Sequence, residues 1–226
     1  MGVVTISRTY GSDGRTVGHQ LAEKLGYMYM DKELIVEVAR RAEVPVSEVE
    51  RFDESPEHPA LRLLKKFLTP AYPGAVTGMA GEEWVASAAL PELAASDVDV
   101  SALDEDAYVR LTQEVMRHTA DQGKVVLMGR GGQALLAGRA DVLHVRVVAP
   151  DAFCVKTISE RDGIGEAETQ KEIARIDDQR RRYVKRHFAT NPKNTDHYHL
   201  IVNTGLIGVE GAAAVITEAA RRLPIT

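Results

Sequence analysis

The sequence is poor in cysteine and has no long apolar run. Cys154 is the single cysteine among 226 residues, so an internal disulfide is excluded and a cytoplasmic location is expected. No apolar stretch approaches ~18 residues, which excludes a membrane-spanning helix. The chain enters an expected strand immediately, which leaves no room for a signal peptide. The sequence also contains no internal repeat and no low-complexity tract.

An excess of positive charge is also missing. The formal net charge is −5, which argues against a partner that is a nucleic acid polymer, although a local basic cluster can still hold a small phosphorylated ligand. Hydrophobic residues make up 44% and charged residues 27% of the chain, as in ordinary soluble globular proteins. The length suits one α/β domain with excursions, or at most two small domains.

The stretch from Val3 to Leu25 carries the clearest structural signals in the sequence. Its first residues, VVTIS, form a short apolar and β-branched run, which predicts a buried strand. Glycines at 11 and 14 end that run. Apolar residues then recur at helical spacing from Thr16, and Gly26 supplies a stop signal. The stretch therefore predicts a strand, a glycine-containing turn and a helix.

A turn between a buried strand and a helix N-terminus is suited to binding phosphate. The first N–H groups of a helix lack internal partners, and the helix dipole favours an anion there. The predicted phosphate-binding residues are Gly11, Ser12, Asp13, Gly14, Arg15 and Thr16. A hydroxyl directly after the basic residue can hold Mg²⁺, so Thr16 is the predicted metal ligand. The strict pattern G-x-x-x-x-G-K-[ST] fails at two positions, where Thr9 replaces glycine and Arg15 replaces lysine.

Further strands and helices alternate along the chain. The expected strands are a short piece before Asp31, the run from Val125 to Met128, DVLHVRVVAP and HLIVNTG. The expected helices are DEDAYVRLTQEVMRHTADQ, QALLAG, a segment around 153–161, a long charged helix at 166–188 and VEGAAAVITEAARRL. This alternation predicts a mainly parallel sheet covered on both faces. Residues 56–101 carry mixed signals and are interpreted as a largely helical excursion.

Ligands of such sheets bind at the carboxyl ends of the strands. Five segments that are far apart in the sequence are expected to follow strand ends: Arg8, the 11–16 turn, Arg130, Pro150 and Asn203. Their convergence on one rim favours a phosphate-ligand site there.

The segment ARIDDQRRRYVKRHF carries a local excess of arginine. On a helix, Asp178, Arg181, Arg182 and Lys185 share one side, and Arg175 lies three residues before Asp178. One interpretation is a solvated helix face with ion pairs. The other is a mobile segment that brings guanidinium groups over a transferring phosphoryl group and excludes water.

These motifs together resemble the cytidylate kinase-like family of P-loop nucleoside monophosphate kinases. The resemblance rests on ISRTYGSDGRTVG, DKELI, GRGG, the arginine-rich helix and LIVNTGLIGVEGAAAVI, and it covers the chain except for roughly residues 56–101. It implies a three-layer α/β/α P-loop NTPase fold with a parallel five-stranded sheet in order 2-3-1-4-5. It also implies one kinase domain over residues 1–226, with an acceptor-side helical insertion at 31–104 and an arginine-rich lid at 162–190.

The resemblance also implies an activity and a set of site residues. The cofactors would be ATP and Mg²⁺, the partners would be small-molecule nucleotides, and the expected acceptor would be CMP or dCMP. The implied catalytic residues are Arg15, Arg175, Arg181 and Arg182, and the implied acceptor-binding residues are Arg8, Asp31, Arg130, Arg161 and Asp178. Asp31 also suits a helix cap, and that alternative stays open.

Two other functions remain open from the sequence. Similar P-loop cores serve other small acceptors, such as a coenzyme precursor or a hydroxy acid. The altered loop also suits a nucleotide-binding regulator without turnover. Cys154 is interpreted as packing, and His187, His197 and His199 are interpreted as structural residues. The oligomeric state, monomer or homodimer, is left open.

Overall fold

The computed structural model describes residues 2–31 and 105–222. Contacts divide the chain into two compact units, one of residues 1–30 with 123–226 and one of residues 31–122. The first unit contains the sheet and the candidate site. The described part of the second unit is Asp31 and one helix, and the predicted insertion at 31–104 otherwise lies outside the described residues.

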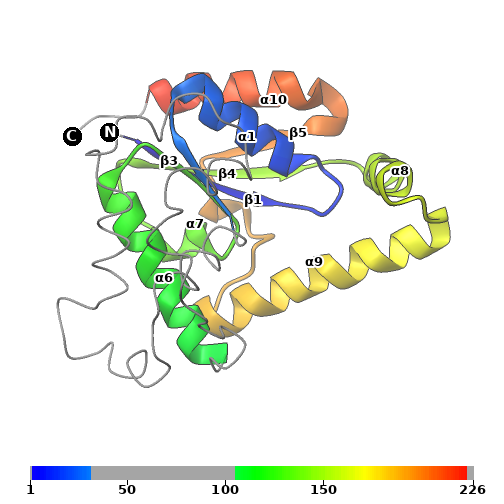
Figure 1. The fold of residues 1–226 in the computed structure, drawn as a ribbon, viewed down its shortest axis with the longest axis horizontal. Coiled ribbons are helices and arrows are strands. Elements are labelled where there is room, and N and C mark those ends of the chain that lie inside the picture. The colour runs from blue at the N-terminus through cyan, green and yellow to red at the C-terminus, as the bar shows by residue number, and fades with distance from the viewer. Residues whose placement is uncertain (1, 32–104, 223–226) are drawn as a thin grey trace, which may run out of the picture. The chain divides into compact units, whose positions relative to one another are not determined.

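A five-stranded parallel sheet forms the centre of the first unit (Figure 1). Its strands are β1 (Val3–Arg8), β2 (Met28–Met30), β3 (Val125–Met128), β4 (Val142–Val148) and β5 (Leu200–Asn203). The order is β2-β3-β1-β4-β5, and every pairing is parallel. The predicted strand order is confirmed. The β-branched start of β1 is buried between β3 and β4, as its continuous apolar sequence predicted.

Helices cover the sheet on both faces. On one face α1 (Gly14–Leu25) and α10 (Thr204–Arg221) pack against Val4 and Ile6 of β1 and their neighbours, and Val17 of α1 lies in the same buried cluster. On the other side of the sheet lies the short α7 (Gly132–Leu135), which contacts β1 and β4 (Figure 1). The architecture is the predicted three-layer α/β/α P-loop fold.

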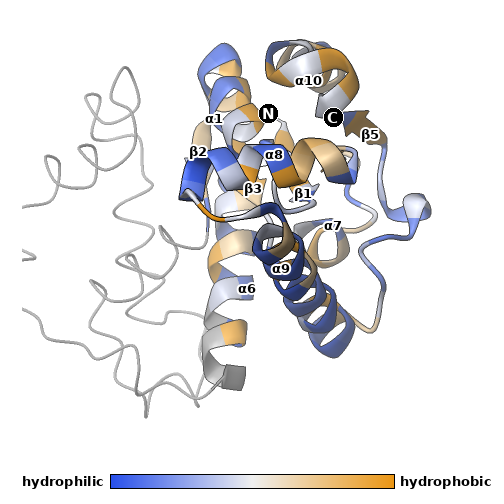
Figure 2. Ribbon diagram, turned by 90° about the vertical axis from the view of Figure 1, so that its right-hand side faces the viewer, coloured by the Kyte–Doolittle hydropathy of each residue, from blue (hydrophilic) through white to orange (hydrophobic). Residues whose placement is uncertain are grey.

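Two helices follow β4 and contact each other: α8 (Asp151–Asp162) and α9 (Glu166–Phe188). The predicted boundaries of the long charged helix, 166 and 188, are confirmed. Figure 2 shows that most residues of α9 are hydrophilic. Its buried side chains are Thr169 and Val184. A single 3-10 turn, η2 (Thr195–His197), leads from α9 toward β5.

The last strand is shorter than its sequence suggested. The prediction extended it through HLIVNTG and began the helix at Val209, whereas β5 ends at Asn203 and α10 begins at Thr204. The Asn203 side chain accepts a hydrogen bond from the Gly205 N–H at 3.1 Å and so caps the helix. Gly208, with φ 70 and ψ 171, interrupts α10 by a kink. The sequence predicted a helix only for the residues after this kink, from Val209 on.

Helix α6 (Glu105–Gln122) is the described helix of the second unit. Its buried side chains recur at helical spacing at Val109, Thr112, Met116 and Thr119, so it has one buried face, as its sequence predicted. No helix in the described residues is long and apolar enough to cross a membrane.

Candidate functional site

The turn between β1 and α1 adopts a tightly curled backbone. Gly11 has φ 84 and Asp13 has φ 52, so the chain passes twice through the left-handed region. A Cβ atom at Gly11 would lie 2.8 Å from both Cβ and the carbonyl oxygen of Cys154. Position 11 is therefore glycine for two reasons, its backbone conformation and the contact with α8. Cys154 itself is buried, in agreement with its interpretation as packing.

Hydrogen bonds fix this loop to the neighbouring strands. The Ser12 hydroxyl is fully buried and donates to the Thr9 carbonyl at 2.9 Å, and it lies 3.4 Å from the Val147 carbonyl. The Thr204 hydroxyl donates to the Ser12 carbonyl at 2.8 Å. Because the Ser12 hydroxyl is hydrogen-bonded inside the protein, Ser12 would bind a ligand through its backbone.

The N-terminus of α1 follows directly and has the properties of an anion site. Asp13 occupies the N-cap position, but its side chain makes no capping hydrogen bond. The first N–H groups of α1, beginning at Gly14, therefore lack the carboxylate that commonly satisfies them. Burial raises the pKa of Asp13, while the positive charge of Arg161 opposes that shift. Arg15 and Thr16 are exposed on the first turn.

Tyr10 connects the loop to both helices that follow β4. The Arg161 guanidinium of α8 donates to the Tyr10 hydroxyl at 2.7 Å, and its Cζ lies 5.5 Å from the ring centroid. The Arg180 Cζ of α9 lies 5.4 Å from the same centroid. Both distances fall in the range of cation–π contacts. The tyrosine ring thus holds two arginines next to the loop.

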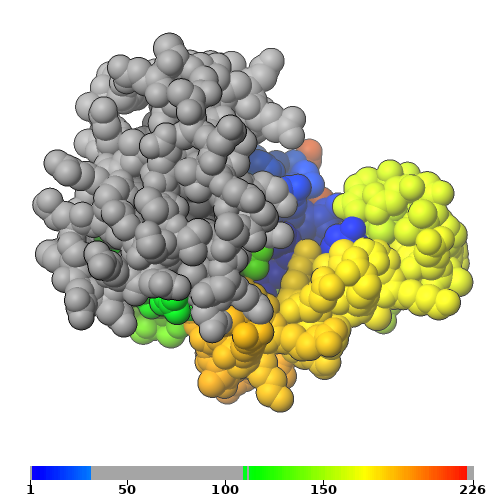
Figure 3. Space-filling view, turned by 60° about the horizontal axis from the view of Figure 1, so that its bottom comes forward, coloured from blue at the N-terminus to red at the C-terminus, as the bar shows by residue number. Residues whose placement is uncertain are grey.

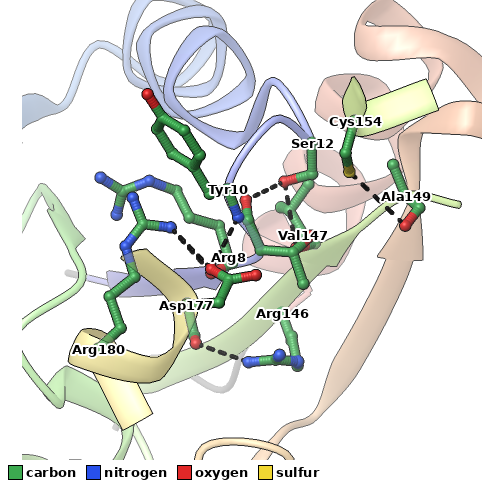
Figure 4. A network of polar contacts seen from close by, with 11 residues as sticks. Arg8, Tyr10, Ser12, Arg146, Val147, Ala149, Cys154, Asp177 and Arg180 are labelled. Carbon is green, nitrogen blue, oxygen red and sulfur yellow. Dashed lines mark hydrogen bonds and ion pairs between the residues drawn. The ribbon is translucent and has the colours of Figure 1, made fainter. Parts of the chain in front are cut away.

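Asp177 of α9 makes a further contact with the loop (Figure 4). Its Oδ1 accepts a hydrogen bond from the Tyr10 backbone N–H at 2.9 Å and lies 3.5 Å from Nη1 of Arg180. Burial raises the pKa of Asp177, while the hydrogen bond from Tyr10 and the charge of Arg180 act in the opposite direction. In the space-filling view of Figure 3, α9 lies against the N-terminal segment drawn in blue, in agreement with this hydrogen bond.

Two predicted acceptor-binding arginines lie at the ends of neighbouring strands. Arg8 ends β1, and its Nη1 lies 3.2 Å from the Cβ position of Gly129, just after β3. Arg130 has φ 51, and its Cζ lies 5.0 Å from the Tyr183 ring centroid. A Cβ at Gly131 would overlap with the ring of Phe188. The GRGG loop is therefore packed directly beneath the C-terminal part of α9.

The other predicted arginines of α9 have partners on their own helix. Arg175 pairs with Glu172 at 2.5 Å, and Arg182 pairs with Asp178 at 2.5 Å. Arg181 also pairs with Asp178. These three arginines are exposed. The contacts fit the interpretation of ion pairs on a solvated face, and the α9 residues that touch the loop are Asp177 and Arg180.

Four residues of this site received no individual role from the sequence: Tyr10, Thr204 and, within the arginine-rich segment, Asp177 and Arg180. Helical spacing gave one usable signal, because Asp177 and Arg180 lie three residues apart and share a side of α9. The others depend on contacts between residues more than 50 positions apart, which local patterns do not contain. Asp31 is buried and belongs to the second unit, so its predicted role stays a prediction.

The histidines have structural partners. His197 Nε2 lies 2.6 Å from the Thr190 hydroxyl, and His199 Nδ1 accepts a hydrogen bond from the His144 N–H at 2.9 Å. Across residues 2–31 and 105–222, no group of His, Cys, Asp and Glu is arranged to hold a metal ion. His197 and His199 thus contact other parts of the protein, and their structural role stays a prediction.

Comparison with known proteins identifies a family. The model of the cytidylate kinase-like family matches residues 3–206. The cytidylate kinase of Aeropyrum pernix is 32% identical over 116 residues, which is 50% of this chain and 67% of that protein. The uronate isomerase of Corynebacterium glutamicum is 27% identical over 115 residues, but this chain spans 22% of its length.

A solved structure of an uncharacterised protein from Eubacterium ventriosum has a similar fold. The two align with a TM-score of 0.64 over 98% of this chain and 99% of that one, at 14% sequence identity. At that identity the similarity concerns the fold alone.

Proposed function

This chain belongs to the cytidylate kinase-like family, and we propose that it is an ATP-dependent phosphotransferase. In this proposal it transfers the γ-phosphoryl group of ATP to a nucleoside monophosphate, with CMP or dCMP as the first candidates. The observation that carries the proposal is the convergence at Tyr10. There a curled loop at a helix N-terminus is joined to arginines from α8 and α9.

The proposed donor site is the loop from Gly11 to Thr16. Its N–H groups at the start of α1 would donate hydrogen bonds to the phosphates of ATP, because they lack a side-chain cap and lie at the positive end of the helix dipole. Arg15 would supply the positive charge that lysine supplies in the usual pattern. Thr16 is exposed on the first turn, and its hydroxyl would hold Mg²⁺, which neutralises phosphate charge when it is bound.

The proposed reaction needs positioning and charge neutralisation. An oxygen of the acceptor phosphate forms a bond to the γ-phosphorus while the bond to the bridging oxygen of ADP breaks, and ADP leaves with that electron pair. The acceptor phosphate is largely ionised at neutral pH, so a strong general base is unnecessary. Arg161 and Arg180 are already held next to the loop by Tyr10, where their charge would stabilise the transferring group.

The proposed lid is the segment 162–190, which includes α9. Arg175, Arg181 and Arg182 are paired with acidic residues of the same helix, so a catalytic role would require exchange of these exposed pairs for phosphate oxygens. Exposed pairs of this kind contribute only about 0–1 kcal/mol each. Replacing these ion pairs by contacts with phosphate oxygens therefore costs little free energy.

The proposed acceptor residues are Arg8, Asp31, Arg130, Arg161 and Asp178. An arginine suits the acceptor phosphate because it forms two parallel charge-assisted hydrogen bonds, whereas an aspartate suits the amino or hydroxyl donors of a base or sugar. The test is a coupled assay of ADP release with a panel of nucleoside monophosphates, coenzyme precursors and hydroxy acids. Turnover with a nucleoside monophosphate supports the proposal. Turnover with a hydroxy acid alone overturns the choice of acceptor, and binding of ATP without any turnover indicates a regulator.

A further inference from the structure

Helix α10 carries large apolar side chains on its outer surface. Leu206 is 76% exposed, Ile207 is 48% exposed and Val215 is 46% exposed. The opposite side of the helix is buried in the core, at Ala212 and Ile216. Figure 2 shows hydrophobic residues along α10, in contrast to α9. A surface helix with one protein contact needs only one apolar side, so the outer side of α10 has the composition of a second contact.

Ile207, Gly211 and Val215 follow one another along this outer side. The Ile207 side chain lies next to Gly211, because a Cβ atom at position 211 would be 3.5 Å from the Cβ of Ile207. Val215 comes one helical turn after Gly211, on the same side. Ala214 is exposed beside it. The surface made of Ile207, Gly211, Ala214 and Val215 is termed the α10 strip.

The glycine in the α10 strip is not required by the helix itself. The residue with non-helical dihedral angles inside α10 is Gly208, so Gly211 has a helical backbone. A Cβ atom at Gly211 would make only ordinary van der Waals contacts within the protein. Alanine would therefore fit there, and it would stabilise the helix relative to glycine. What glycine provides is a place where a second backbone can approach closely.

The α10 strip has nearly the same side chains on both sides of Gly211. Ile207 lies one turn before this glycine and Val215 lies one turn after it. If two copies of α10 pack antiparallel across a two-fold axis at Gly211, each Ile207 contacts Val215 of the other copy, and the two glycines face each other. A surface that meets its own copy in this way is self-complementary, as a two-fold interface requires.

The charges next to the α10 strip suit the same arrangement. The first turn of α10 contains no acidic residue. Glu218 is exposed and lies as far after Gly211 as Thr204 lies before it, so the Glu218 carboxylate of one copy comes to the helix N-terminus of the other. The helix dipole stabilises a negative charge at that end. Glu210 lies about 100° around the helix from Gly211, outside the contact.

We propose that the α10 strip is a homodimer interface, in which α10 packs antiparallel against α10 of a second copy of this chain. The proposal does not depend on phosphoryl transfer. A pair of helices forms a small interface, and small interfaces belong to weak and reversible complexes. The dimer is therefore in equilibrium with the monomer.

The test is sedimentation velocity of the full chain at protein concentrations up to about 1 mM, because small interfaces dissociate in this range. Ile207→Lys and Val215→Glu each place a charge opposite an apolar side chain of the second copy. The double variant places the two opposite charges against each other across the axis, whereas within one chain they are two turns apart. Circular dichroism melting verifies that each variant is folded.

Ile201→Lys is the matched control. Ile201 is 43% exposed, similar to the apolar residues of the α10 strip. It belongs to β5, where its neighbour Val202 is buried on the side of α10. Successive residues of a strand point to opposite faces, so the Ile201 side chain points away from α10. The control introduces the same charge on an equally exposed isoleucine outside the proposed interface.

We expect a monomer–dimer equilibrium in the wild type and in Ile201→Lys. Each single variant of the α10 strip should dimerise at least ~10-fold more weakly, because a charge is desolvated without a partner. The double variant should associate more tightly than either single variant, because its charges pair across the axis. A wild type that stays monomeric overturns the proposal, as do single variants that dimerise like the wild type. A double variant that associates no better than the single variants overturns the antiparallel arrangement.

Gly211→Ala separates association from folding. In dilute protein its melting temperature should equal or exceed that of the wild type, because alanine favours the helix. Dimerisation should nevertheless weaken severalfold, because the two added methyl groups keep the helices apart. Wild-type dimerisation in Gly211→Ala would overturn the close approach of the two helices at this position.

Discussion

Arg180 of α9 lies over the ring of Tyr10, with its Cζ 5.4 Å from the ring centroid. One turn earlier on the same helix, Asp177 accepts a hydrogen bond from the Tyr10 N–H at 2.9 Å. A single loop residue therefore fixes the position of α9 through both its backbone and its side chain. The arrangement of the arginines around the loop depends on Tyr10.

Substitution of Tyr10 should separate its two contributions. Tyr10→Phe removes the acceptor for Arg161 but keeps the ring, so we expect a loss of turnover of only severalfold. Tyr10→Leu also removes both cation–π contacts, each of about 0.5–2 kcal/mol, and should reduce kcat at least ~10-fold. Steady-state kinetics with a melting curve for each variant provide the measurement. Equal kcat in the wild type and a folded Tyr10→Leu protein would show that the ring does not position the arginines.

Substitution of Gly11 tests whether the loop must pack against α8. In Gly11→Ala the new Cβ would lie 2.8 Å from Cys154, so the loop must shift and nucleotide affinity should fall at least ~10-fold, with a lower melting temperature. Gly138→Ala is a matched control, because Gly138 has φ 80 but nothing within 4 Å of its Cβ position. It should show only the backbone cost of a left-handed conformation for alanine, roughly 1–2 kcal/mol. Identical melting and nucleotide binding in the two variants would contradict the packing argument.

Arg15 should act in catalysis and contribute little to the fold. It is exposed on the first turn of α1, so its removal leaves no cavity. Arg15→Ala should lower kcat by at least ~10²-fold, the scale for loss of one charge-stabilising donor, with melting unchanged. Arg15→Lys keeps a compact charge but loses the planar fork, and partial activity is expected. Full activity of folded Arg15→Ala would remove Arg15 from the mechanism.

His144 should make the folded state sensitive to acid. Burial, followed by the charge of His199, lowers the pKa of His144 from 6.5 to about 4, and its Nδ1 lies 2.8 Å from the Thr5 hydroxyl. Between these pH values the unfolded chain binds a proton that the folded chain does not. Stability is therefore complete above about pH 6.5 and falls as the pH is lowered toward 4, by up to roughly 3 kcal/mol.

Urea unfolding of the wild type and His144→Gln at several pH values measures this effect. Glutamine does not titrate, so the difference in stability between the two proteins should shrink as the pH falls. An NMR titration of the folded wild type provides a second measurement. An imidazole of His144 that titrates near pH 6.5 would contradict the assignment.

The sequence predicted the layers of the fold more completely than the contacts of the site. The strand order was implied by the family resemblance, and the boundaries of α9 were predicted from the local sequence pattern. The start of α10 was missed because Asn203 reads as the end of a strand, yet its side chain caps the helix. The local sequence shows a residue that can cap a helix, but it does not show whether Asn203 continues the strand or caps the helix.

The prediction of the arginines shows the same limit. Helical periodicity identified the face with Asp178, Arg181 and Arg182, and ion pairs do form there. Contact with the loop instead comes from Asp177 and Arg180, because the docking of α9 on Tyr10 selects a neighbouring face. Tertiary packing decides which face of a charged helix contacts the rest of the protein. When similar charges occur on several faces, the sequence does not indicate which face that is.

The most direct test of the account follows the phosphoryl group itself. The full chain is incubated with Mg²⁺, CMP and ATP that is radiolabelled in its γ-phosphate, and the products are separated. The account predicts labelled CDP in a 1:1 ratio with ADP, and no ADP above background when CMP is omitted. Label that appears only as inorganic phosphate, or ADP that forms at the same rate without any acceptor from the panel, would contradict phosphoryl transfer to a nucleoside monophosphate.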